Sequence, residues 1–222
     1  MRLAMAQLAK ILLGIGTAIV VALSFLYLPA AEGFPSPELA RIVALHLPNA
    51  MAGLVAAVAA GCYGWRYLAG GRNPLDDARS LVAAVLATIF LALTTVTGMV
   101  FAQVQWGQFW NWDPKQTCIF ILLLIFAAYF VLRAGIEDEE KRATVSAVYI
   151  LFAAVMTPVL GYMVPKYLPS LHPTNTSFDA AYHTVIWSAS ACLIGLYAWL
   201  FNLGVRYERL RLHLDAIVRD EP

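Results

Sequence analysis

The 222-residue sequence has few charged side chains and no field of one sign. Only 13% of its residues are charged, against roughly 25% in an average soluble domain. The hydrophobic fraction is 61% and the formal net charge is +1. A chain with so little positive charge has no electrostatic means of recruiting nucleic acid. This composition excludes an ordinary soluble domain and indicates a protein that crosses a membrane several times.

Cysteine motifs and a phosphate-binding loop are also missing. Cys62, Cys118 and Cys192 are far apart and lie in or beside apolar runs, and neither CxxC nor CxxCH occurs. The sequence therefore predicts no disulfide framework, no zinc site and no haem attached covalently to this chain. A GxxxxGK[ST] loop is absent too, so any ATP-driven step would belong to a partner.

Apolar runs of the length needed to cross a bilayer, about 20 helical residues, recur six times. They are approximately Ile11–Ala30, Leu45–Tyr67, Ser80–Ala102, Thr117–Leu132, Thr144–Val164 and Thr184–Leu203. The first exceeds the 7 to 15 apolar residues of a secretory signal, so we expect it to be retained. The predicted fold class is an all-α polytopic membrane protein with six transmembrane helices, forming a single membrane domain over residues 1–222.

The distribution of basic residues predicts the orientation. With the N-terminus in the cytoplasm, twelve of the fifteen Lys and Arg residues are on the inside. The three left outside are Arg41, Lys115 and Lys166. Such an excess of inner basic residues predicts that both termini are cytoplasmic. The aromatic segment near residue 110 and the loop 165–183 then lie on the outer face.

The segment WGQFWNWDPKQT, Trp106–Thr117, contains three of the six tryptophans. Tryptophans at a membrane edge commonly form an interfacial belt, and that interpretation accounts for one or two of them. The spacing WxxxWxW turns the indoles in several directions, and a belt requires neither Asp113 nor Lys115. The segment therefore favours a binding function over anchoring alone.

Three of the four histidines are predicted to lie on the same side as this segment. His46 is at the outer edge of the second span and His172 is in the outer loop before the sixth, each beside helix-breaking, proline-containing sequence (HLP and LHP). We interpret His183, at the start of the sixth span, as a structural residue. Imidazole is a common axial ligand of haem iron. Two histidines, flat aromatic rings and the cations Lys115 and Arg41 for propionates suit haem better than a bare metal ion.

The same residues carry a resemblance to a known family. WGQFWNWDPKQT resembles the tryptophan-rich "WWD" signature of the haem-handling proteins of cytochrome c assembly, approximately WGxxWxWD followed by a basic residue. RIVALHLPNAMAG and SLHPTNT are similar to the segments with the outer histidines of that family, and TVTGMVFAQVQWG to the approach to its motif. The resemblance runs from about residue 39 to 205, with the signature in an outer loop at 103–116.

Membership of that family would imply the residues of a non-covalent haem b site. His46 and His172 would be the axial metal ligands. The platform and propionate partners would be Trp106, Gly107, Phe109, Trp110, Trp112, Asp113 and Lys115, to which the residue chemistry alone adds Arg41. Six spans and 222 residues are most like the CcmC branch (haem exporter), whereas Asp-Pro-Lys after WNW resembles the CcsA type.

The resemblance implies a protein of the bacterial inner membrane that holds haem on the periplasmic face. It would present haem to a CcmE-like chaperone together with the ABC-type subunits CcmA and CcmB, a small CcmD-like subunit and surrounding lipid. It would be a haem-handling protein and not an enzyme. The alternatives are a CcsA-type synthase component, a b-type haem redox protein and, more weakly, a transporter, although the spans contain few charges to mark a substrate path.

Overall fold

The computed structural model describes residues 2–172 and 178–220, and these contain no β-strand. Six helical segments are long and apolar enough to cross a membrane. They are α1 (Arg2–Leu26), α2 (Val43–Ala69), α3 (Pro74–Trp106), α4 (Pro114–Ala134), the segment formed by α5 (Glu139–Pro158), the π-helical η2 (Val159–Met163) and α6 (Val164–Lys166), and α7 (Ala180–Asp220). The short 3-10 helix η1 (Leu39–Ile42) precedes α2. The predicted all-α fold with six spans is confirmed.

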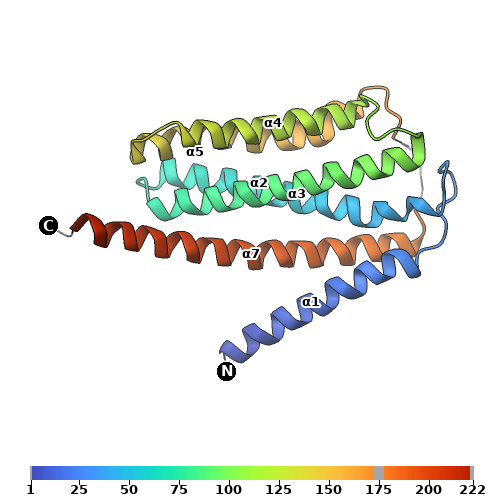
Figure 1. Cartoon of the computed structure of the whole chain (residues 1–222), viewed down its shortest axis with the longest axis horizontal. Coiled ribbons are helices and arrows are strands. Elements are labelled where there is room, and N and C mark those ends of the chain that lie inside the picture. Colours follow the sequence, from blue (N-terminus) through green and yellow to red (C-terminus); the bar gives the residue numbers. More distant parts are fainter. Residues whose placement is uncertain (1, 173–177, 221–222) are drawn as a thin grey trace.

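Helices α2 to α5 and α7 form an elongated bundle (Figure 1). Helix α1 contacts α7 and diverges from the bundle toward the N-terminus. The short turns after α2 and α4 lie at one end, with both termini on that side (Figure 1). The irregular segments 27–38 and 107–113 lie at the other end. We call these the inner and outer ends after the predicted orientation. The compartment that each end faces stays a prediction.

Small residues allow the central helices to approach closely. Ala52, Ala56 and Ala60 of α2 are fully buried against their neighbours. A Cβ atom added at Gly61 would lie only 2.6 Å from that of Ala154. Close backbone approach of this kind is how helices pack in lipid, where no hydrophobic force drives them together. The centre of the bundle therefore combines close helix contacts at small residues with fully buried large side chains such as Phe126 and Tyr129.

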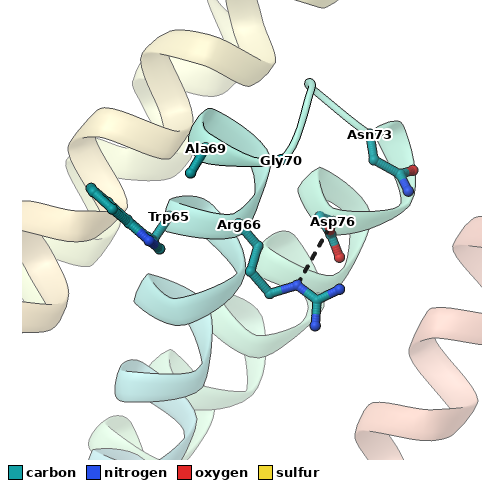
Figure 2. Close-up of a pocket in the computed structure, with 6 residues that line it drawn as sticks. All are labelled: Trp65, Arg66, Ala69, Gly70, Asn73 and Asp76. Carbon is teal, nitrogen blue, oxygen red and sulfur yellow. Dashed lines mark ion pairs between the residues drawn. The ribbon is translucent and has the colours of Figure 1, made fainter.

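At the inner end, polar groups satisfy one another over short distances. Arg133 donates two hydrogen bonds to Asp77, at 2.7 and 2.5 Å. Asp76 pairs with Arg79 at 2.8 Å. It also pairs with Arg66 at 3.6 Å, and these two residues help to line a pocket (Figure 2). These contacts join α2, α3 and α4 without an irregular loop.

At the outer end, the segment after α1 folds against α3 and α7. Leu28 and Phe34 are buried in a cluster with Phe101 and Tyr182, and Gln105 exchanges two 2.9 Å hydrogen bonds with the backbone of Ser36. Helix α1 ends at Leu26, so the prediction that the first span continues to Ala30 was wrong. A proline disfavours helical geometry in the residue before it, and Pro29 follows Leu28.

Candidate haem-binding site at the outer end

Two local signals end the flanking helices and define the aromatic loop. Gly107 follows α3 with φ 80°, a left-handed conformation that glycine adopts without strain. Asp113 is the N-cap of α4 and accepts a 2.9 Å hydrogen bond from the amide of Lys115, with Pro114 in the first helical position. The non-helical segment is therefore 107–113, shorter than the predicted loop 103–116, and Trp106 is the last residue of α3.

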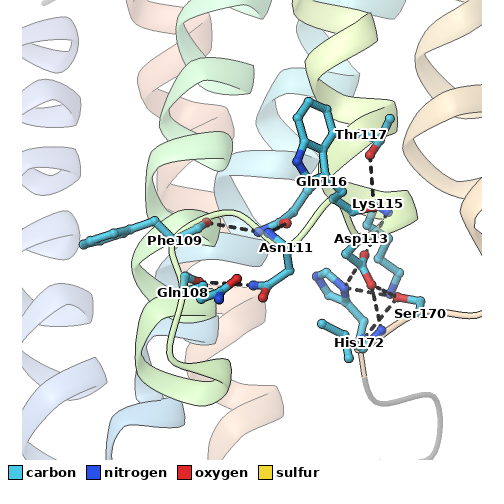
Figure 3. Close-up of polar contacts among 11 residues, drawn as sticks. Gln108, Phe109, Asn111, Asp113, Lys115, Gln116, Thr117, Ser170 and His172 are labelled. Atoms are coloured by element: carbon cyan, nitrogen blue, oxygen red, sulfur yellow. Dashed lines mark hydrogen bonds and ion pairs between the residues drawn. The ribbon is translucent and has the colours of Figure 1, made fainter.

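The Asp113 carboxylate joins the aromatic loop to the segment before α7. Its side chain is completely buried. Oδ2 accepts hydrogen bonds from the Ser170 hydroxyl at 2.8 Å and the Leu171 amide at 2.7 Å, and Oδ1 accepts one from Nδ1 of His172 at 2.9 Å (Figure 3). With the bond from Lys115, one carboxylate receives four donors. We call this arrangement the Asp113 clamp.

The charges of the clamp are set by burial and hydrogen bonding. Burial alone would raise the pKa of Asp113, but the hydrogen bonds from Ser170, Leu171 and Lys115 outweigh it and hold the pKa below its usual 3.8. Burial lowers the pKa of His172 below its usual 6.5, and the charge of Lys115 lowers it further, while Asp113 partly offsets both. At neutral pH a neutral imidazole therefore donates from Nδ1 to a carboxylate.

An aromatic contact also fixes the His172 ring. The indole of Trp106 meets it edge to face, with ring centroids 5.0 Å apart and planes at 69°. Trp106 in turn packs against Phe101 at 5.5 Å, which belongs to the buried outer cluster. The imidazole is thus held by a carboxylate at one nitrogen and by an indole at the ring.

His46 reaches the same end of the bundle from α2. Its Nδ1 lies 3.0 Å from the hydroxyl oxygen of Thr97 on α3. The imidazole is close enough to His172 and Lys115 for their charges to interact. The expectation that HLP breaks the helix was wrong, because Pro48 lies inside α2. Helices in membranes tolerate an interior proline because neighbouring groups satisfy the freed backbone carbonyl.

The aromatic side chains of the loop differ in their surroundings. Trp110 packs edge to face against Phe120 of α4 and against Trp112, at 6.0 and 5.8 Å. Phe109 is 53% exposed and Trp112 is 72% exposed. Trp112 also has φ 53°, a left-handed conformation that bulky residues rarely adopt. Neither burial nor backbone preference accounts for a tryptophan at this position.

Arg41, one of the predicted site residues, makes its polar contacts outside the cluster. Arg41 forms a 2.7 Å ion pair with Glu38 and a 3.3 Å bond to the Phe25 carbonyl. Among the described residues, no hydrogen bond or ion pair connects Arg41 to the clamp or to His46. His183 is exposed in the first turn of α7, and its structural role stays a prediction. Lys115 is exposed beside both histidines.

Three residues of the site were not anticipated. Buried Gln116 shapes the loop by accepting from the Asn111 amide at 2.8 Å and donating to the Phe109 carbonyl at 3.2 Å. A glutamine three residues after an N-cap aspartate is a capping-box pattern that offered a signal for it. Ser170 and Thr97 had no such signal, because their partners are distant in the chain.

Taken together, the fold and the cluster define a six-span helical membrane protein that gathers two histidines and an exposed aromatic loop at one end. The sequence profile of the cytochrome c assembly proteins matches residues 2–172. The chain belongs to the cytochrome c assembly protein family, and the predicted resemblance is confirmed. The matched range begins earlier than the expected range of 39 to 205, and it also ends earlier.

Individual relatives agree with this assignment. The chain is 27% identical to heme exporter protein C of Bradyrhizobium diazoefficiens over 199 residues, which cover 85% of this chain and 73% of that protein. It is 24% identical to heme exporter protein C of Paracoccus denitrificans over 157 residues, or 68% and 65% of the two chains. A shorter match, 51% identical over 59 residues, covers 27% of this chain and 18% of the cytochrome c biogenesis protein CcsA of Manihot esculenta.

Proposed function

We propose that this chain binds haem b non-covalently at the outer end of the bundle, on the periplasmic face of the bacterial inner membrane, and presents it to a CcmE-like chaperone. The observation that carries the proposal is the pair of imidazoles. His46 and His172 are each engaged through Nδ1. With the proton on Nδ1, Nε2 of each ring holds the lone pair that can bind iron. Two such nitrogens are the donors that haem iron takes as axial ligands.

The donor set favours haem over a bare metal ion. A protein-bound zinc ion takes three or four protein donors, and within residues 2–172 and 178–220 no three His, Cys, Asp or Glu side chains converge. Haem iron needs only two donors from the protein because the porphyrin supplies four. The proposed site meets that smaller requirement.

The surrounding residues have distinct roles in this proposal. Phe109, Trp110 and Trp112 offer ring faces to the macrocycle, and Lys115 offers a cation to a propionate. Asp113 is buried, and it orients His172 by accepting a hydrogen bond from its Nδ1. Arg41 would have to leave Glu38 to reach a propionate.

Transfer of haem requires partners that match this site. We assign the receiving role to the CcmE-like chaperone and the ATP-driven step to CcmA and CcmB, with a CcmD-like subunit in the same complex. The chain itself binds and releases haem without making a covalent bond to it. Membership of a cytochrome c assembly family and the similarity to heme exporter proteins support this assignment.

Absorption spectroscopy of the purified protein tests the haem site. We expect a Soret band that is weakened in His46→Gly and in His172→Gly and lost in the double variant. His183→Gly is the control and should keep its haem. Full haem retention in the double variant would refute the axial assignment. Transfer to an apo-chaperone separates a presenting protein from a b-type redox protein, which would keep its haem.

Cysteine labelling tests the face on which the site lies. In a background without Cys62, Cys118 and Cys192, a cysteine at Gln108 should react with an impermeant thiol reagent in intact cells. A cysteine at Gly135, in the turn after α4, should react only after permeabilisation. The opposite pattern would place the cluster on the cytoplasmic side.

The CcsA-type function is the second candidate, because a stretch of 59 residues is 51% identical to the CcsA protein of Manihot esculenta. A protein of that type would deliver haem to the cysteines of an apocytochrome and not to a chaperone. Mixing the haem-loaded protein with each acceptor separately distinguishes the two functions by the acceptor that gains the haem.

A further inference from the structure

Thr97 and Gly98 lie on α3 one turn before Phe101 of the buried outer cluster, and both lie beside the imidazole of His46. The Thr97 hydroxyl oxygen lies 3.0 Å from Nδ1. A Cβ atom built on Gly98 would lie 3.0 Å from Cε1 of the same ring. Neither residue belongs to the aromatic loop or to the Asp113 clamp, and neither has a role in the proposed function above.

The hydrogen bonds of Thr97 determine which nitrogen of His46 carries the proton. A hydroxyl has one hydrogen to donate and two lone pairs with which to accept. The Thr97 hydroxyl lies 2.8 Å from the Leu93 carbonyl and 3.2 Å from the Thr94 carbonyl. A threonine in a helix commonly donates its hydrogen to a carbonyl of the preceding turn, and the 2.8 Å distance to the Leu93 carbonyl fits that bond. Toward His46 the hydroxyl is then an acceptor, and Nδ1 of His46 is the donor.

A neutral imidazole has one N–H and one lone pair. With the proton on Nδ1, the lone pair is on Nε2, which is the nitrogen left for iron. Gly98 also leaves space for the imidazole of His46. A contact of 3.0 Å is too short for a carbon against a ring, so any side chain at position 98 would push the imidazole by a few tenths of an ångström.

We infer that Thr97 and Gly98 are positioning residues that prepare His46 for haem before haem arrives. Thr97 selects the tautomer with the lone pair on Nε2. Gly98 has no side chain that would displace the imidazole between α2 and α3. The inference rests on the proposed function for its purpose. Its structural content, the tautomer and position of one imidazole in the haem-free protein, stands independently of it.

The test uses the full-length protein, labelled with ¹⁵N-histidine in lipid nanodiscs, first without haem. Nitrogen chemical shifts of His46 should report the Nδ1–H tautomer. Thr97→Val keeps the shape but removes the acceptor, and should give a mixture of tautomers and haem retention reduced about fivefold, the effect of one neutral hydrogen bond. Thr97→Ser should restore both. Thr95→Val is the matched control, because Thr95 bonds only the Leu91 carbonyl.

Gly98→Ala separates position from tautomer. It should leave Nδ1 protonated while shifting the Soret band or the electron paramagnetic resonance of bound haem, and Gly14→Ala, where nothing lies within 4 Å, should do neither. An Nε2–H tautomer in the haem-free wild-type protein would overturn the inference, as would unchanged tautomer and haem retention in Thr97→Val. Absence of haem from the wild-type protein would instead refute the proposed function, while the tautomer measurement still decides the positioning role of Thr97.

Discussion

His172 and His46 are held at the outer end by different chemistry. His172 follows an irregular segment and donates to a fully buried carboxylate that also receives three other donors. His46 lies in the first turn of a long helix, and its hydrogen-bond partners are neutral groups of the neighbouring helix, the Thr97 hydroxyl and the Thr94 backbone. The first arrangement depends on two loops folding together, and the second on the packing of α2 against α3.

This difference bears on how the two imidazoles would bind iron. An imidazole that donates to a carboxylate is a more basic ligand than one that donates to a neutral group. If both rings bind one iron, His172 is the stronger donor and His46 is the one that a receiving protein displaces first.

Asp113→Ala should remove the His172 arrangement. It deletes an N-cap, worth about 1 kcal/mol, and leaves buried donors without an acceptor at about 1 to 3 kcal/mol each. We expect thermal unfolding in detergent to show a loss of about 3 kcal/mol or more. Asp138→Ala is the control, since exposed Asp138 caps α5 through the Lys141 amide alone. Equal losses in the two variants would show that the clamp adds nothing beyond capping.

Free imidazole should distinguish the two arrangements. Added to His172→Gly, it can regain the bond to Asp113, whereas in His46→Gly it regains only bonds to neutral groups of α3. Hydrogen bonds to charged groups are worth about 1 kcal/mol more than neutral ones. We expect half of the lost haem binding to return at an imidazole concentration about fivefold lower in His172→Gly. Equal concentrations, or the reverse order, would contradict the comparison.

The smallest effect is a change in the protonation of His172. Asp113 raises the pKa of His172 and Lys115 lowers it. Asp113→Asn should therefore lower the pKa further below 6.5, and Lys115→Gln should raise it. A nitrogen NMR titration of the haem-free protein measures both changes, with Lys141→Gln at the inner end as the control. Shifts of the same sign in the two variants would show that some other group controls this imidazole.

Much of the fold could be predicted because lipid imposes a simple requirement on sequence. Each span must be apolar for about 20 residues, so all six were found from hydropathy. Their ends were less certain, since Leu28 is equally apolar in a helix and in the buried cluster where it lies. The prediction that Pro48 breaks the helix was wrong for a similar reason, because the effect of a proline depends on neighbouring helices and not on local sequence.

The site was predictable only in its residue types. Histidines, tryptophans and Lys115 were recognisable from their chemistry and from the family signature. The clamp was not, because Ser170 and Asp113 are 57 residues apart and a serine in a loop has many possible partners. The contact of Thr97 with His46 was still harder to predict, because threonines within spans commonly bond to their own helix, as this one also does.

Trp112 has a consequence for any attempt to stabilise this protein. A left-handed backbone costs a side-chain-bearing residue roughly 1 to 2 kcal/mol, and an indole that is 72% exposed returns little of that through burial. A method that ranks substitutions by folding free energy would therefore select glycine or asparagine at position 112. Gains at such positions commonly come with a loss of activity. If Trp112 stacks on haem as proposed, a thermostabilised variant should retain this tryptophan despite its cost in folding free energy.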